Sequence, residues 1–238
     1  MAAESKSFVS QTCDGSKNAS ARTLNSDDPV RIRVADLANW TQVGLVFAVI
    51  MLAVWTPQGR FNSGLSLLAV FCILWLTFRG PYSARELGFT RPASGAVAIF
   101  AAGALITIAI AASGPFTRIL GPAHAVPWSR AWQYAIWALA QEFILQSFFY
   151  VRLESILGGW RALLATAFLF AVAHIPSPLL TAMSFFGALF FCEMFRRYRN
   201  IFPLGLVHAV IGLTIAASLP DRLLHHMRVG IGFLQYHP

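Results

Sequence analysis

Three ionisable side chains interrupt apolar segments in the second half of the chain. Glu142 lies in WALAQEFILQSFFY, His174 in FLFAVAHIP and His208 in PLGLVHAVIG. No Lys, Arg or Asp occurs between Trp132 and Val151, so the Glu142 carboxylate has no salt-bridge partner within its own segment. Because a charge at membrane depth costs several kcal/mol unless it is paired or hydrated, these residues form a candidate functional site.

The three groups are of types that can hydrolyse a polar bond. An acid beside an imidazole can activate water, and a second imidazole can donate a hydrogen bond to a developing oxyanion. On a helix, Glu142 and Gln146 share a face, and Gln141 lies about 100° around the axis. A purely structural explanation is open too, with Glu142 protonated and hydrogen-bonded and each histidine buried in the core. Their placement in three different helices favours a site inside a helix bundle.

Metal binding is an alternative use of the same residues, since one glutamate and two histidines are a ligand set that zinc accepts. The chain has no His-Glu-x-x-His motif and no Cys-x-x-Cys pair, and Cys13, Cys72 and Cys192 are scattered. We therefore expect no metal and no cofactor, and a divalent ion remains the alternative. Glu193 stands beside arginines in FCEMFRRYRN, so we expect it to form ion pairs rather than to catalyse.

The elements that must position these residues are apolar helices. Of the 238 residues, 57% are hydrophobic and 12% are charged, against about 25% charged in ordinary soluble domains. This composition predicts an all-α, polytopic membrane helix bundle, and it outweighs a nucleic-acid interpretation of the net charge of +8. About seven transmembrane or membrane-embedded helices are expected, over 39–57, 63–79, 95–113, 131–156, 161–175, 178–195 and 202–219.

Polar sequence flanks the bundle. We expect residues 1–36 to be a disordered cytoplasmic tail, residues 37–220 one transmembrane domain and residues 221–238 a short polar C-terminal tail. An excess of arginine marks cytoplasmic loops and predicts a cytoplasmic N-terminus. The arginines that this orientation places inside are Arg79, Arg85, Arg91, Arg152, Arg161, Arg196, Arg197 and Arg199.

The stretch from Gln141 to about Pro220 resembles the CAAX protease and bacteriocin-processing enzyme (CPBP) family, also called the Abi family of glutamic intramembrane proteases. That family carries Glu-Glu-x-x-x-Arg, Phe-x-x-x-His and His-x-x-x-Asn on successive helices. The corresponding sequences here are QEFILQ from Gln141, FAVAH ending at His174 and HAVIG from His208. Upstream, RELGFTRP before a Gly/Ala-rich apolar segment is also similar to the family.

Three positions depart from the family pattern. Gln141 stands at the family's first glutamate, Gln146 at its arginine and Gly212 at its asparagine. A glutamine cannot act as a general base, and a glycine has no side-chain donor. The loss of one acid and one base together leaves the net charge of the pocket similar and makes it less costly to bury.

The resemblance implies an intramembrane endopeptidase of the glutamic type, which cleaves a membrane-anchored protein or peptide near its anchor segment. Its catalytic residues would be Glu142 as base, His174 orienting it and His208 stabilising the oxyanion, with Gln141 and Gln146 in support. Its partners would be this substrate and the lipid bilayer, not nucleic acid. As an integral membrane protein it would lie in the inner (cytoplasmic) membrane of a bacterium.

Two other functions stay open. The replaced glutamate suits a non-catalytic relative, a pseudoprotease or immunity-type scaffold that binds membrane segments without cutting them. A transporter would use Glu142 as a proton relay, but the sequence has no inverted repeat to accompany it.

Overall fold

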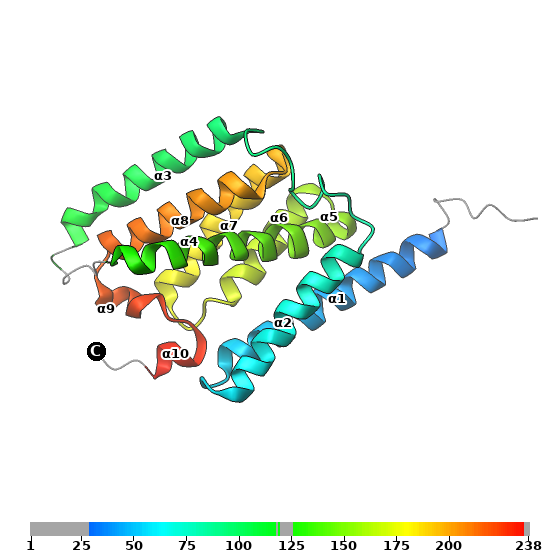
Figure 1. Ribbon diagram of the computed structural model, residues 1–238, viewed down its shortest axis with the longest axis horizontal. Coiled ribbons are helices and arrows are strands. Elements are labelled where there is room, and N and C mark those ends of the chain that lie inside the picture. Colours follow the sequence, from blue (N-terminus) through cyan, green and yellow to red (C-terminus); the bar gives the residue numbers. More distant parts are fainter. Residues whose placement is uncertain (1–28, 118, 120–125, 236–238) are drawn as a thin grey trace, which may run out of the picture.

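The computed structural model describes residues 29–117, 119 and 126–235, and over these residues the protein is an all-α bundle (Figure 1). Among them, five helices are long and apolar enough to cross a membrane. The predicted polytopic helical fold is confirmed. The elements are α1 (Pro29–Trp55), α2 (Arg60–Arg79), α3 (Ala96–Thr117), α4 (Trp128–Glu142), the π-helical η2 (Phe143–Tyr150), α5 (Val151–Leu157), α6 (Gly159–Val172), α7 (Pro178–Tyr198), α8 (Ile201–Ser218), α9 (Asp221–Leu224), the 3-10 turn η3 (His225–Met227) and α10 (Gly230–Leu234).

Helix α8 is the centre of the bundle. It packs against α3 on one side and α4 on the other, while α6 packs against α7, and α1 against α2 and α5 (Figure 1). Glycines allow these close contacts: a β-carbon on Gly103 would lie 2.4 Å from Val207, and one on Gly205 would lie 3.0 Å from the Leu139 Cα. Small residues at such crossings let helix backbones approach within a membrane. Larger residues there would push α8 away from its neighbours.

The predicted long segment 131–156 is one continuous helical rod, made of α4, η2 and α5. The junction residues Phe143 (φ −60°, ψ −47°) and Val151 (φ −59°, ψ −41°) keep right-handed helical angles. The Val151 N–H bonds the Gln146 carbonyl five residues back, which is the π-helical pattern. Such segments are rare and frequently occur at functional sites. Here the π segment begins immediately after Glu142.

The loop between α2 and α3 forms hydrogen bonds with the start of α8 and with η2. The Asn200 side chain, at the start of α8, donates to the carbonyl oxygens of Arg91, Pro92 and Ser94 at 2.9–3.0 Å. The Ser147 hydroxyl in η2 donates to the Leu87 carbonyl oxygen at 2.7 Å. The RELGFTRP sequence therefore fixes α8 and η2 relative to one another.

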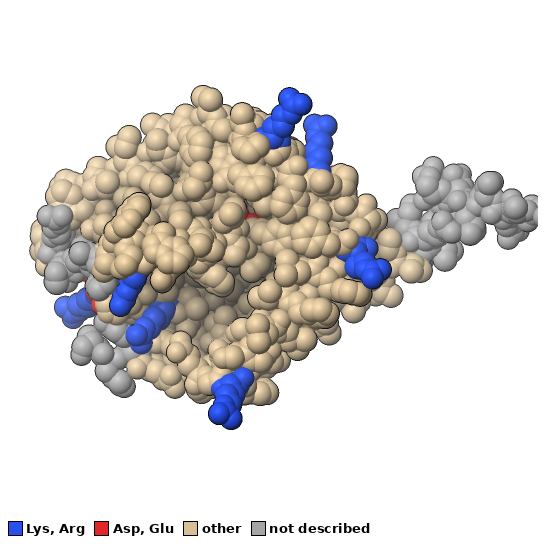
Figure 2. All heavy atoms as spheres, viewed as in Figure 1, with Lys and Arg blue, Asp and Glu red and all other residues tan. Residues whose placement is uncertain are grey.

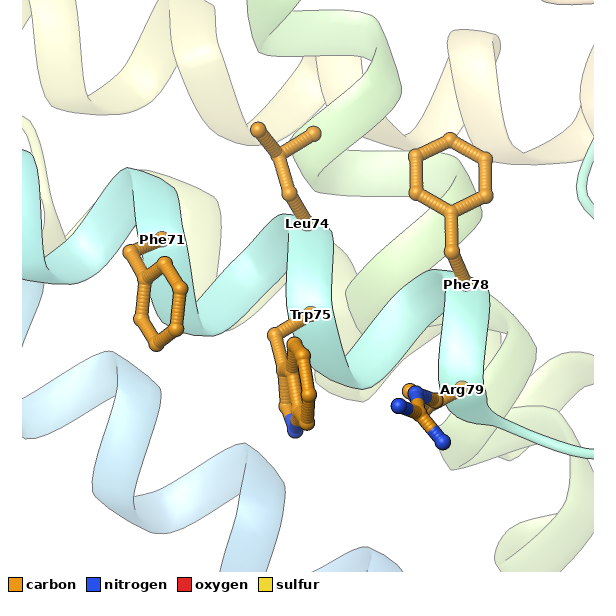
Figure 3. Close-up of a pocket in the computed structure, with 5 residues that line it drawn as sticks. All are labelled: Phe71, Leu74, Trp75, Phe78 and Arg79. Carbon is orange, nitrogen blue, oxygen red and sulfur yellow. The ribbon is translucent and has the colours of Figure 1, made fainter.

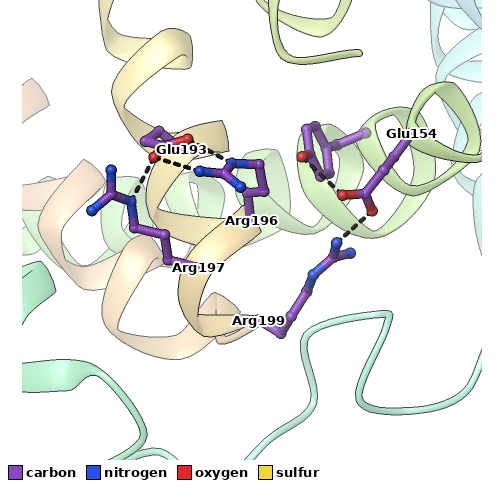
Figure 4. A network of polar contacts seen from close by, with 6 residues as sticks. Glu154, Glu193, Arg196, Arg197 and Arg199 are labelled. Atoms are coloured by element: carbon purple, nitrogen blue, oxygen red, sulfur yellow. Dashed lines mark hydrogen bonds and ion pairs between the residues drawn. The ribbon is translucent and has the colours of Figure 1, made fainter. Parts of the chain in front are cut away.

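Most charged side chains of the described residues lie at the edges of the bundle, and Glu142 and Arg152 are buried exceptions. Figure 2 shows arginine side chains around the rim of one face, and most of the surface between them is uncharged. Glu193 accepts hydrogen bonds from Arg196 at 2.8 and 2.9 Å and from Arg197 at 2.5 Å, and Arg199 pairs with Glu154 (Figure 4). The prediction that Glu193 forms ion pairs is confirmed.

The two predicted tails differ from expectation where the structure describes them. Residues 29–36, expected to be disordered, form the first turns of α1, and residues 1–28 lie outside the described part of the chain. The predicted polar C-terminal tail contains α9 and α10. The Gly230 N–H donates to the Ile175 carbonyl oxygen at 2.8 Å, and α10 packs on α1, so this segment belongs to the bundle.

Arg152 is fully buried and donates hydrogen bonds to three elements. It donates to the Gln42 side chain at 2.9 Å and to the carbonyl oxygens of Phe148 and Leu76 at 3.1 and 2.8 Å. Leu76 lies in the last turn of α2, where carbonyl groups have no intrahelical donor. Arg152 thus joins α1, α2 and the π segment.

Arg152→Ala is expected to lower the free energy of unfolding by about 3 kcal/mol, because it leaves buried acceptors without donors. The measurement is labelling of the buried Cys192 thiol in a Cys13→Ser/Cys72→Ser background, which reports opening of the bundle. Arg161→Ala is the control, since Arg161 is exposed and contacts the Trp160 ring. Equal labelling rates in the two variants would contradict this role.

Candidate active site

Glu142 is fully buried at the end of α4, and both of its carboxylate oxygens have partners. Oε1 lies 2.8 Å from Nδ1 of His208 on α8, and Oε2 accepts a hydrogen bond from Nε2 of Gln146 at 3.1 Å. Buried charges persist in proteins when they are paired and hydrogen-bonded in this way. The structure therefore brings together two of the three residues that the sequence singled out as catalytic.

The meeting of Glu142 and His208 follows from how α4 and α8 pack. Gly205 approaches Leu139, and Gly212 approaches Tyr134, so the two helices run antiparallel. Side chains on a helix lean towards its N-terminus and cover the preceding turn. Glu142 and His208 each stand three residues beyond the Leu139–Gly205 contact, so both lean back over it and meet.

His174 lies in the turn after α6 and faces a different partner. Its Nδ1 is 2.6 Å from the Phe170 carbonyl oxygen, and among the described residues it makes no hydrogen bond to Glu142. Since a carbonyl oxygen only accepts, Nδ1 carries the proton and Nε2 keeps a lone pair. This tautomer leaves His174 with a basic nitrogen.

Aromatic rings connect the two histidines. The Phe170 ring lies 4.6 Å from the His174 ring and 6.3 Å from the His208 ring, between centroids. Phe191 on α7 stacks on His208 at 4.9 Å with an interplanar angle of 18°. The His208 side chain keeps 12% exposure while Glu142 keeps none, so the imidazole is the more accessible member of the pair.

The two supporting glutamines occupy different environments. Gln146 is fully buried, and its Oε1 has no hydrogen-bond partner in the described structure. Gln141 is partly exposed, and its side chain makes no hydrogen bond to any described residue. Gln146 therefore holds Glu142 in place of the charged residue that the family resemblance leads one to expect.

Phe191 and Tyr134 border this site without having been assigned a role from sequence. Phe191 reaches His208 from α7, and no spacing pattern marks it among twenty phenylalanines. The Tyr134 hydroxyl fills the space beside Gly212, one turn beyond His208 on α8. The sequence carries a weak signal for Tyr134, a polar group on the same apolar helix as Glu142 but about 80° around its axis.

The described part of the chain holds no group of three His, Cys, Asp or Glu side chains placed to bind a metal ion. Glu142 and His208 contact each other directly, and His174 is bonded to a carbonyl group.

A groove of about 320 Å³ lies on α2, away from the buried pair (Figure 3). It is lined by Phe71, Leu74, Trp75, Phe78 and Arg79. The Phe78 ring stacks on Phe143, the residue after Glu142, with centroids 6.0 Å apart. One end of the groove therefore touches the helix that carries the buried acid.

Comparison with known families finds one match, over the part of the chain that carries these residues. Residues 123–214 match the family model of the type II CAAX prenyl endopeptidase Rce1-like proteins, and this range contains Glu142, His174 and His208. No curated protein and no solved structure matches the chain. The resemblance to the CAAX protease family is confirmed, and the segment from α4 to α8 is similar to a family of peptidases. The five long apolar helices of the described residues are those of an integral membrane protein, and its residues 123–214 are similar to this family of membrane peptidases.

Glu142→Ala is expected to destabilise the protein by about 3 kcal/mol, because His208 and Gln146 lose their acceptor in a buried place. Glu142→Gln keeps one side-chain carbonyl oxygen as an acceptor, so this variant should be destabilised less than Glu142→Ala. Thermal unfolding in detergent, followed by circular dichroism, ranks the two variants. A Gln variant less stable than the Ala variant would show that these hydrogen bonds do not hold the site.

Proposed function

We propose that this protein is an intramembrane endopeptidase that hydrolyses a peptide bond near the anchor segment of a membrane-anchored protein or peptide. The observation that carries the proposal is the buried contact between Glu142 and His208, with His174 nearby, in a peptidase-like helix bundle. A buried acid beside two imidazoles suits acyl transfer to water.

The two histidines take complementary parts in this proposal. Nε2 of His174 accepts a proton from water, and the water oxygen bonds the peptide carbonyl carbon. The carbonyl π-electron pair moves to oxygen and forms an oxyanion. His208 in its protonated form donates Nδ1–H to Glu142, which leaves Nε2–H for the oxyanion. The C–N bond then breaks, and the leaving amine takes the proton from His174.

Glu142 positions His208 in this scheme and is not the base. Its carboxylate is fully buried, and both oxygens accept hydrogen bonds, so it is poorly placed to take a proton from water. The base therefore becomes His174, whose Nδ1 is bonded to the Phe170 carbonyl group. Gln146 holds the carboxylate, and Gln141 is left as a donor at the edge of the site. The scheme needs no metal and no cofactor.

The α2 groove supports a substrate that comes from the bilayer. Its aromatic lining is exposed on the outside of α2, and Phe78 links it to Phe143 beside Glu142. An apolar anchor lying against Leu74 and Phe78 would bring the adjoining peptide towards the buried pair. Arginine-rich loops support a cytoplasmic N-terminus in a bacterial inner membrane.

A non-catalytic scaffold is the second candidate function, and the full burial of Glu142 beside Gln141 favours it. Such a protein would hold a membrane segment in the same place without cutting it. The two functions differ in one measurable respect, which is the appearance of cleaved product.

His174→Ala and His208→Ala are each expected to lower the cleavage rate by about 10² or more, since each removes a proton-transfer group or an oxyanion donor. The assay uses the protein in liposomes with a panel of fluorogenic peptides that carry alkyl chains, isoprenoid chains or an apolar helix. Glu142→Gln should also lose activity, because His208 loses its anionic partner. Insertion and folding of each variant are checked by Cys192 protection. Binding of the peptides without cleavage by any form would support the scaffold instead.

Phe78→Ser is expected to raise KM for an anchored peptide about tenfold with kcat unchanged, because it removes apolar contact worth about 1.4 kcal/mol. Phe186→Ser is the matched control, since Phe186 is exposed on α7 and does not line the groove. Equal KM values for the two variants would exclude the groove as the anchor site.

A further inference from the structure

Three successive residues between α9 and α10 have left-handed backbone angles. The φ angles are 48° at His225, 52° at His226 and 56° at Met227, and none of the three is a glycine. Residues with a side chain normally adopt this region singly and at a cost in free energy, so a run of three persists only where other contacts hold it. The contacts on either side of this turn therefore maintain it.

The turn lies within residues 221–234, which we call the C-terminal strap and which run from the end of α8 to the end of α1 (Figure 1). Before the turn, Leu224 is buried in the core, and α9 packs on α7. After the turn, Phe233 of α10 packs on the His225 ring with centroids 4.4 Å apart, and α10 packs on α1. The strap thus connects α1 with the helix that carries His208.

Gly230 lies where the strap touches both α1 and the turn that carries His174. Its N–H group, at the first position of α10, donates to the Ile175 carbonyl oxygen at 2.8 Å. A β-carbon on Gly230 would lie 2.3 Å from the Val54 carbonyl oxygen, and the φ angle of 54° at this residue is left-handed. Both conditions require a glycine, so any other residue would push the strap away from Val54 and Ile175.

We infer that the C-terminal strap positions His174 for catalysis and that Gly230 is the positioning residue through which it acts. This inference rests on the proposed function. Ile175 directly follows His174, so the hydrogen bond from Gly230 fixes the backbone beside the imidazole. The other hydrogen bond of this imidazole, to the Phe170 carbonyl oxygen at 2.6 Å, joins it only to the end of its own helix. With the strap attached, the proposed base has a fixed position relative to α1 and α8.

The left-handed turn makes this attachment a control point. A segment that carries backbone strain and few contacts opens more readily than the core of a bundle. Detachment of the strap relaxes His225, His226 and Met227, which opposes part of what the Gly230 hydrogen bond contributes. Release of the strap would therefore slow hydrolysis without unfolding the helices.

Gly230→Ala tests the inference, because its methyl group would meet the Val54 carbonyl oxygen and detach the strap. With the peptide of the panel that the wild-type protein cleaves fastest, kcat should fall about 10²-fold and KM should stay within about twofold, since a displacement of about 1 Å at a catalytic group has this effect. Gly232→Ala is the matched control. A β-carbon there would meet no neighbouring group within 4 Å, so the strap stays attached and kcat is retained.

Hydrogen exchange of the amides of residues 171–177 reports release of the turn directly. Gly230→Ala should speed this exchange about tenfold or more, while the Cys192 thiol stays protected in the Cys13→Ser/Cys72→Ser background. Phe233→Ala is a milder release, because it removes the ring that packs on His225 and inserts no group. It should change the exchange rate and kcat in the same direction and by less. Where Gly230→Ala also exposes Cys192, the Phe233→Ala variant takes its place.

Combination with His174→Ala separates positioning from a general structural effect. If the strap acts through His174, Gly230→Ala lowers kcat no further once His174 is alanine, whereas an independent structural loss would be additive. Additive losses, or a released turn with an unchanged kcat, would overturn the inference alone. A wild-type protein that cleaves none of the peptides would overturn the proposed function and the inference together.

Discussion

A single buried carboxylate constrains how this bundle can assemble. Glu142 has no exposure to solvent, so its charge is tolerated only while His208 and Gln146 supply hydrogen bonds. Gln146 comes with the same helix, but His208 comes from α8, 66 residues later. The hydrogen bonds of the buried Glu142 side chain therefore depend on the register of α8 against α4. Gly205 allows the close approach of the two helices that this register needs.

The polar contacts outside the site hold the two helices in that register. Asn200 fixes the start of α8 to three carbonyl groups of the α2–α3 loop, and the same loop accepts a hydrogen bond from Ser147 in η2. Arg152 joins η2 to α1 and α2. Dispersion alone orients apolar helices weakly in lipid, because lipid tails are as apolar as the side chains. A few directional hydrogen bonds at one end of the bundle therefore carry much of its specificity.

The sequence predicts those features that depend on composition and spacing. The apolar pattern predicts a last helix over 202–219, and α8 spans Ile201–Ser218. A run of apolar residues that is ended by polar ones has few other structures in a membrane. The sequence does not predict that His208, and not His174, contacts Glu142. That contact depends on how the helices pack, and the spacing of residues along the chain carries no information about it. The π segment has no local signal either, since one altered hydrogen bond per turn leaves the apolar pattern intact. Residues 29–36 are helical although their polar composition is typical of disorder, because they continue the apolar helix that follows them.

His174 and His208 differ in the group that their Nδ1 atoms contact. At His174 a neutral carbonyl oxygen fixes the proton on Nδ1, so Nε2 is left to accept one. At His208 the Nδ1 atom faces the Glu142 carboxyl group, and the proposed scheme uses Nε2–H of this ring as a donor. Gln141 and Gln146 bring no charge of their own to this group of side chains. The proposed function gives the two imidazoles different roles because one faces a carboxyl group and the other faces only the backbone.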